Sequence, residues 1–127
     1  MDSCYSYWVG GLFPLLQDAL ADLNDDALDC SGWLFDQKAA QEYVLLSCQK
    51  MAGGIIDKPG RSADPYHSCY ALSGLSLAQH FLFGKFAEDE AVGGAANLVH
   101  ATVPIHNISP ESFQTAAVFF AETYSDS

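Results

Sequence analysis

Apolar residues recur at every third or fourth position in several segments of the chain, which is the spacing of one face of an α-helix. The first of these segments is Ser6–Leu23, where Gly10-Gly11 and Pro14 interrupt the pattern. Because proline lacks a backbone donor, we expect a helix that is kinked or begins late. Asp2 or Ser3 is available as its N-cap.

The acidic, turn-rich stretch Asn24–Gly32 is predicted to be a loop before a second helix. That helix is expected over Asp36–Gln49, with Asp36 as its N-cap and Gly53-Gly54 beyond its end. On or near one of its faces, the pattern places Ala39, Tyr43, Val44 and Leu46.

The last two predicted helices begin with the same combination of residues. In each, a capping side chain precedes a proline, which fits the first position of a helix. Asp64-Pro65 opens a helix to about Phe81, and Ser109-Pro110 opens one to about Tyr124. Phe83–Val103, between them, is predicted to be a long, irregular surface segment. Helices separated by glycine turns, without an alternating strand pattern, predict an all-α fold.

Composition narrows the class of protein. The chain has 127 residues, at most one ordinary domain, and a formal net charge of −11 with only five basic residues. That balance disfavours nucleic acid or an anionic membrane surface as a partner. No stretch is long and apolar enough to span a bilayer, and no leader pattern opens the chain, so we expect a cytoplasmic protein. Its four cysteines would then be reduced.

Three residues of different types are candidates for a metal site. Asp2, Cys4 and His67 offer a carboxylate, a thiol and an imidazole, which are all ligands of Zn²⁺, and three protein ligands leave a fourth position for chemistry. Each also has an ordinary structural role, as an N-cap, a small buried side chain and a hydrogen-bonded residue at a helix start. Their spacing alone leaves both interpretations open.

Other polar residues are given simpler roles. Asp64 is interpreted as an N-cap, and Cys69 diverges from His67 on a helix because the two are only two positions apart. The cysteines lack the paired spacing of a structural zinc domain. No site assignment is made for Cys30, Cys48, His80, His100 and His106.

Several long blocks, in order along the chain, resemble the β-subunit of protein farnesyltransferase, in the prenyltransferase β-subunit family. The blocks are DSCYSYWVGGLFPLL, QEYVLLSCQ, AGGIIDKPGRSADPYHSCYALSGLSLAQHF and, more weakly, VPIHNISPESF. The resemblance implies an α/α toroid, a barrel of six α-hairpins around a central pocket. It also implies that residues 1–127 are an incomplete, C-terminal portion of that toroid, which would pair with a prenyltransferase α-subunit.

The resemblance implies a zinc-dependent transfer of farnesyl from farnesyl diphosphate to the cysteine thiol of a C-terminal CaaX motif. Residue by residue, it gives Asp2, Cys4 and His67 as zinc ligands and associates Asp57 with Mg²⁺ at the departing diphosphate. The substrate-binding positions that it implies are Tyr5 (diphosphate), Trp8 (isoprenoid pocket), Tyr66 (lipid and peptide junction), Tyr70 (isoprenoid length), and Lys58 and Arg61 (basic loop). Arg61 stands where lysine is more familiar in the family.

Two alternatives remain open beside the farnesyl enzyme. Type I geranylgeranyltransferase β-subunits share the Asp-x-Cys-Tyr-Ser start, but they generally lack a carboxylate at the position of Asp57 and carry a less obstructive residue at that of Tyr70. The other alternative is a truncated, non-catalytic helical module that serves only to interact with other proteins. Because the basic residues that cradle the diphosphate lie upstream in the family, we expect the isolated chain to be inactive.

Overall fold

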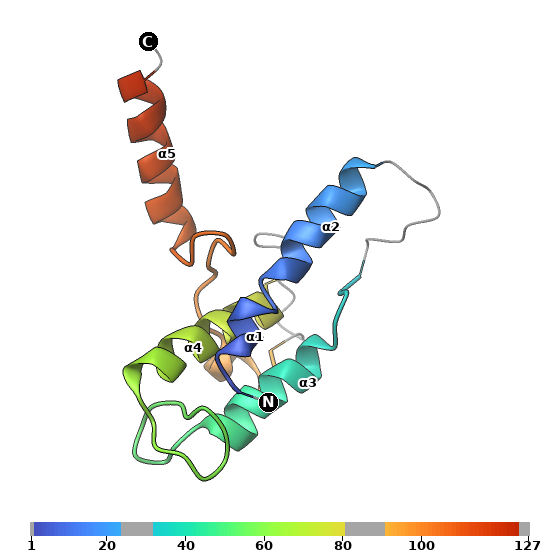
Figure 1. The fold of residues 1–127 in the computed structure, drawn as a ribbon, viewed down its shortest axis with the longest axis vertical. Coiled ribbons are helices and arrows are strands. Elements are labelled where there is room, and N and C mark those ends of the chain that lie inside the picture. Colours follow the sequence, from blue (N-terminus) through green and yellow to red (C-terminus); the bar gives the residue numbers. More distant parts are fainter. Residues whose placement is uncertain (1, 24–31, 81–90, 125–127) are drawn as a thin grey trace.

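Helix α4 lies at the centre of the fold and contacts both α1 and α3 in this computed structural model (Figure 1). The structure describes residues 2–23, 32–80 and 91–124. In chain order its elements are α1 (Tyr5–Trp8), α2 (Leu12–Asp22), α3 (Gln37–Glu42), the π-helix η1 (Tyr43–Cys48), α4 (Pro65–Gln79), the 3₁₀-helix η3 (Ala95–Asn97) and α5 (Pro110–Tyr124). The described residues contain isolated β-bridges and no strand, so the predicted all-α fold is confirmed.

Two of the predicted helix starts depend on aspartate caps. The Asp36 carboxylate accepts a hydrogen bond from the backbone N–H of Ala39 at 2.9 Å, and Asp64 accepts one from His67 at 2.9 Å. Each bond satisfies a donor that the first turn of a helix leaves free. Both caps are therefore confirmed, and the predicted loop 24–32 lies almost wholly outside the described residues.

The first predicted helix is broken, as its glycines and proline indicated. α1 and α2 are separate, and the turn between them requires a glycine at position 10, because a Cβ there would lie 2.0 Å from the carbonyl oxygen of Ser6. Neither predicted cap, Asp2 or Ser3, occupies the N-cap position of α1, although the Asp2 carboxylate accepts a hydrogen bond from the backbone N–H of Cys4 at 3.2 Å. The N-cap position of α1 is Cys4, without a side-chain bond to the helix, and the Ser3 hydroxyl donates instead to Ile56 O at 2.7 Å. The Ser3 side chain, which the local pattern predicted to cap the helix, thus bonds to a residue that is distant in sequence.

The second helix begins as predicted but changes its winding at Tyr43, where η1 follows α3. Val44 is buried, yet Leu46 is 77% exposed, so the predicted face was wrong for Leu46. A π-helix adds residues to each turn and rotates the following side chains relative to an α-helix. That rotation turns Cys48 inward, where it is fully buried.

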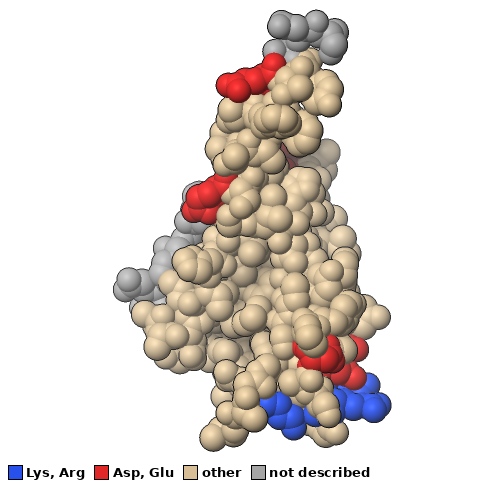
Figure 2. Space-filling view, turned by 90° about the vertical axis from the view of Figure 1, so that its left-hand side faces the viewer, with Lys and Arg blue, Asp and Glu red and all other residues tan. Residues whose placement is uncertain are grey.

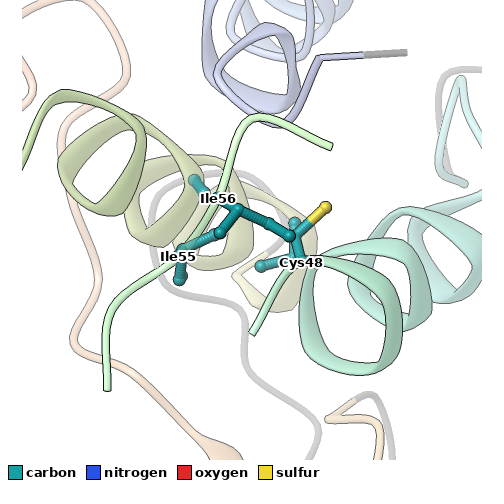
Figure 3. Close-up of a cluster of buried hydrophobic side chains, with 5 residues drawn as sticks. Cys48, Ile55 and Ile56 are labelled. Atoms are coloured by element: carbon teal, nitrogen blue, oxygen red, sulfur yellow. The ribbon is translucent and has the colours of Figure 1, made fainter. Parts of the chain in front are cut away.

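A small apolar core joins the π-helix to α4. The side chains of Cys48, Ile55 and Ile56 meet there (Figure 3), together with Val44 and Ala71. Backbone contacts reinforce this packing, since Ile56 N–H donates to Cys48 O at 2.9 Å. The core therefore fixes the segment that leads directly to Asp57.

The segment after α4 was predicted to be an irregular surface excursion. Residues 81–90 lie outside the described part, and residues 91–103 contain only η3. Two fully buried amides nevertheless hold this segment against the helices. Gln41 accepts from Val92 N–H at 2.9 Å, and Gln79 accepts from Val99 N–H at 3.0 Å. The prediction of irregular structure is confirmed, but the segment is anchored to α3 and α4.

Helix α5 extends away from the other helices (Figure 1), and none of its described residues is buried. Its aromatic side chains contact one another along the helix, with Phe119 and Phe120 5.4 Å apart between ring centroids. Across the described residues, no helix is both long and apolar enough to cross a bilayer.

Candidate functional site

Two of the three predicted metal ligands lie at the entrance to α1. The Asp2 carboxylate accepts a hydrogen bond from the backbone N–H of Cys4 at 3.2 Å, which folds the two side chains into one turn. The Cys4 thiol is buried, with 5% of the residue exposed. Burial raises the pKa of this thiol, and the neighbouring Asp2 carboxylate raises it further. The hydrogen bond from Cys4 holds the pKa of Asp2 below its usual value.

The third predicted ligand, His67, lies in the first turn of α4 between two carboxylates. Its Nδ1 is 2.6 Å from Asp64 Oδ2, and its Nε2 is 3.2 Å from Asp2 Oδ1. The hydrogen bond to Asp64 is the main reason why the pKa of His67 is raised. When Nδ1–H is donated to Asp64, Nε2 faces Asp2 and donates to that carboxylate as long as the imidazole is protonated.

Asp64 therefore has two functions, only one of which was expected. It caps α4 through His67 N–H, and it also orients the imidazole through Nδ1. These hydrogen bonds from His67 lower the pKa of Asp64. A signal for the second function was present in the sequence, because an Asp-x-x-His start places the third helical residue beside the cap.

The tertiary fold brings these side chains together across 63 residues of sequence, from Cys4 to His67. One oxygen of Asp2, the sulfur of Cys4 and one ring nitrogen of His67 all lie within 4.8 Å of one another. Ligands of a tetrahedral Zn²⁺ are separated by roughly 3 to 4 Å, so a small contraction would complete the geometry. Cys69 is exposed and is not part of this cluster among the described residues. The sulfur, nitrogen and oxygen donors suit a borderline-soft divalent cation.

Asp57 approaches the same cluster from the loop that follows the small core. Its Oδ1 is buried and has no hydrogen-bond donor among the described residues, while its Oδ2 is 3.5 Å from Lys58 Nζ. Its charge contributes to raising the pKa of His67, after the larger effects of Asp64 and Asp2. A buried carboxylate oxygen without a donor is suited to a cation.

The two basic residues that were predicted to bind substrate from this loop, Lys58 and Arg61, are both exposed. Lys58 and Arg61 share one turn, in which Arg61 N–H donates to Lys58 O at 3.2 Å. Figure 2 shows Lys and Arg side chains gathered at the end of the molecule opposite the tip of α5, on a face that is otherwise mostly uncharged. Both residues therefore lie close to Asp57 in sequence, and Lys58 Nζ also lies 3.5 Å from Asp57 Oδ2.

An aromatic wall borders the donor cluster. Its members are Trp8 and Tyr66, about half exposed, with Tyr70 behind them. The Trp8 indole N–H donates to Tyr66 OH at 3.1 Å, and the ring of Tyr70 lies 4.5 Å from that of Trp8 and 4.9 Å from that of Tyr66. The ring of Tyr66 is in turn 5.1 Å from that of His67. Tyr7, which sequence reasoning missed, stacks on Tyr70 at 5.5 Å.

Of the aromatic residues that were predicted to bind substrate, Tyr5 does not belong to this wall. It is 54% exposed and lines a separate groove of about 620 Å³ together with Phe13, Phe35 and Tyr43. Asp2 borders that groove as well, whereas Trp8 is not one of its lining residues.

The described residues form helices without strands, as expected for a protein of the α-α toroid class. The family model described as "Prenyltransferase alpha-alpha toroid domain" matches residues 1–108, and the chain belongs to this family. The predicted toroid membership and the resemblance to a prenyltransferase β-subunit are thereby confirmed.

Named relatives refine this comparison. The chain is 33% identical to protein farnesyltransferase subunit beta of Pyricularia oryzae over 95% of its length, and 38% identical to that of Dictyostelium discoideum over 67%. It also resembles the structure of Candida albicans protein geranylgeranyltransferase-I complexed with GGPP, with a TM-score of 0.59, 29% identity and 90% of this chain covered. The chain spans only 27%, 20% and 25% of these proteins, respectively.

Proposed function

We propose that this chain is the metal-bearing, C-terminal segment of a zinc-dependent protein farnesyltransferase β-subunit, which acts in the cytoplasm together with an α-subunit. The single observation that carries the proposal is the convergence of Asp2, Cys4 and His67 within 4.8 Å beside an aromatic wall. The relatives named protein farnesyltransferase subunit beta support the same activity.

The proposed reaction joins the cysteine thiol of a CaaX C-terminus to C1 of farnesyl diphosphate, forming a thioether and releasing diphosphate. Zn²⁺ held by the three donors would supply a lowered thiol pKa for the incoming cysteine. In this chain, the hydrogen bond from Nδ1 to Asp64 leaves Nε2 of His67 as the nitrogen that would bind the metal, and the Asp2 carboxylate is already ionised at neutral pH. Because the pKa of His67 is raised, the donors would release the Cys4 proton and, from the protonated imidazole, the Nε2 proton on binding the metal.

The remaining predicted residues would serve the two substrates. Trp8 and Tyr66 offer half-exposed aromatic faces to the isoprenoid next to the donors. Asp57 would hold Mg²⁺ through its unpaired Oδ1 at the leaving diphosphate, with Lys58 beside it. The aromatic wall would contact the apolar chain of a prenyl diphosphate, and the charged loop would face its diphosphate group.

A second candidate is a type I geranylgeranyltransferase β-subunit. The observation that favours it is the resemblance to the geranylgeranyltransferase-I structure with GGPP. Against it stand the Asp57 carboxylate and the Tyr70 ring, which packs at 4.5 Å against Trp8 and which the resemblance associates with a limit on isoprenoid length.

The first experiment measures zinc in the purified protein and in the variants Cys4→Ala and His67→Ala. Near one zinc per chain in the native protein, lost in both variants, is expected. Cys69→Ala is the matched control, because this exposed cysteine lies two residues from His67 and outside the donor cluster. Native protein without zinc would contradict the proposed metal site.

The second experiment uses this chain joined to the upstream half of a β-subunit and assembled with an α-subunit. It supplies equal concentrations of farnesyl and geranylgeranyl diphosphate and a CaaX peptide. We expect farnesylated peptide to predominate. Geranylgeranylated peptide as the main product would instead establish the second candidate. Full zinc content without any transfer would indicate a non-catalytic interaction module.

A further inference from the structure

One extended segment, Ile55–Asp57, connects the two parts of the chain that carry the metal-site donors. On one side lies Ser3, between Asp2 and Cys4 in sequence and 1% exposed. Its backbone N–H donates to Asp57 O at 2.7 Å, and its hydroxyl donates to Ile56 O at 2.7 Å. Two short hydrogen bonds from one residue therefore fix this turn against the segment.

On the other side, Ser68 follows His67 in α4. Its hydroxyl accepts a hydrogen bond from Ile55 N–H at 2.9 Å and lies 3.4 Å from Ile55 O. A serine adjacent to a metal-site donor thus contacts the segment from each side. Each serine holds its own neighbouring donors against the segment. The distance between the Asp2–Cys4 turn and His67 therefore depends on these serine hydrogen bonds.

The segment Ile55–Asp57 is itself held firmly in place by burial and by backbone pairing. Ile55 and Ile56 are 7% and 3% exposed and belong to the small core with Cys48. β-Bridges pair Ile55 with Gln49 and Ile56 with Ala63. Close-packed interiors resist displacement, so a side chain bonded to this segment inherits its rigidity.

We propose that Ser3 and Ser68 are positioning residues that set the distance between the Asp2–Cys4 turn and His67 through the shared segment Ile55–Asp57. The proposal rests on the proposed zinc site and extends it, because the backbone N–H of Ser3 also bonds to the backbone carbonyl of Asp57, the candidate Mg²⁺ residue.

The chain offers a matched control for this proposal. Ser76 is 2% exposed, and its hydroxyl donates to His100 O at 2.8 Å, so it resembles Ser3 in burial and in hydrogen bonding. It lies toward the opposite end of α4 from His67. Removing either hydroxyl takes a hydrogen-bond donor away from a backbone carbonyl, but only Ser3 adjoins the metal-site donors.

The test compares Ser3→Ala, Ser68→Ala and Ser76→Ala in the protein assembled as it is for the transfer assay. The zinc dissociation constant is measured by competition with a chelator. We expect it to rise roughly tenfold in Ser3→Ala and Ser68→Ala, the usual effect of losing a residue that orients a metal ligand. Ser76→Ala should match the native protein, and equal zinc constants in all three variants would overturn the proposal.

A second measurement needs no metal. The rate of alkylation of Cys4 by iodoacetamide in metal-free protein is followed by mass spectrometry, with the exposed Cys69 as internal reference. The rate for Cys4 should rise about fivefold in Ser3→Ala, the factor that corresponds to one lost hydrogen bond, and stay unchanged in Ser76→Ala.

The two measurements separate the possible failures. Native protein that binds no zinc contradicts the proposed function, and the alkylation rates then decide the role of Ser3 alone. Native protein that binds zinc, with Ser3→Ala and Ser76→Ala alike in both measurements, overturns the positioning role. If Ser3→Ala does not fold, the zinc constants of Ser68→Ala and Ser76→Ala decide it.

Discussion

The contact between Gly74 of α4 and Ser6 of α1 offers a direct test of how the fold assembles the site. A Cβ added at Gly74 would lie 1.9 Å from Ser6 Oγ, 2.4 Å from Ser6 Cβ and 2.6 Å from the Ser6 carbonyl carbon. Rotating the serine side chain relieves only the first of these clashes. The last involves backbone, so Gly74→Ala must move α1 away from α4.

Two opposing effects set the size of the change. Overpacking costs typically about 1–3 kcal/mol, and replacing a helix-interior glycine with alanine returns about 1 kcal/mol. Because backbone is displaced, we expect the upper part of the overpacking range and a net loss of about 1–2 kcal/mol. That loss corresponds to a fall in melting temperature of roughly 3–10 °C for a domain of this size.

The assay is urea denaturation followed by circular dichroism, together with zinc content. Displacing α1 moves Asp2 and Cys4 relative to His67, so Gly74→Ala should also lose zinc. Gly32→Ala is the control, because a Cβ there meets nothing within 4 Å. A Gly74→Ala protein as stable as the native one, with full zinc, would refute this account of the packing.

Three further predictions concern single side chains. Tyr70→Leu should raise kcat/KM for geranylgeranyl diphosphate relative to farnesyl diphosphate several-fold, because it removes the ring that packs at 4.5 Å against Trp8. Asp64→Asn should lower the pKa of His67 toward its usual value, measured by NMR in metal-free protein, and weaken zinc binding roughly tenfold. Burial raises the pKa of Tyr43 to about 12, so the folded state disfavours its phenolate, and the free energy of unfolding should fall as pH rises from 10 to 12.

Each of these predictions has a conservative control. Tyr70→Phe keeps the ring and should retain the farnesyl preference, so a switch in that variant would contradict the role of ring size. Asp36→Asn changes an equivalent cap on α3 that has no histidine beside it, and it should leave zinc binding intact. Tyr43→Phe should lessen the alkaline loss of stability. An unchanged loss would show that other groups cause it.

Local sequence determined where α3, α4 and α5 begin. Asp36 and Asp64 cap because their carboxylates reach a donor only three residues away, and Pro65 and Pro110 occupy first helical positions for the same local reason. Such signals act within one turn, so no other part of the chain is needed to interpret them. The types of the candidate donors were equally legible, since carboxylate, thiol and imidazole are properties of the residues themselves.

Only the tertiary structure decided where those donors lie. Cys4 approaches His67 because Gly74 lets α1 contact α4, and because Ser3 bonds to the backbone of Ile56, 53 residues away. The same long-range bond removed Ser3 from the capping role that its local pattern predicted. The π-helical turn that exposes Leu46 is likewise absent from the apolar pattern. Packing and hydrogen bonds between distant segments determine these features, and a periodic pattern records only a segment's preference for a helix.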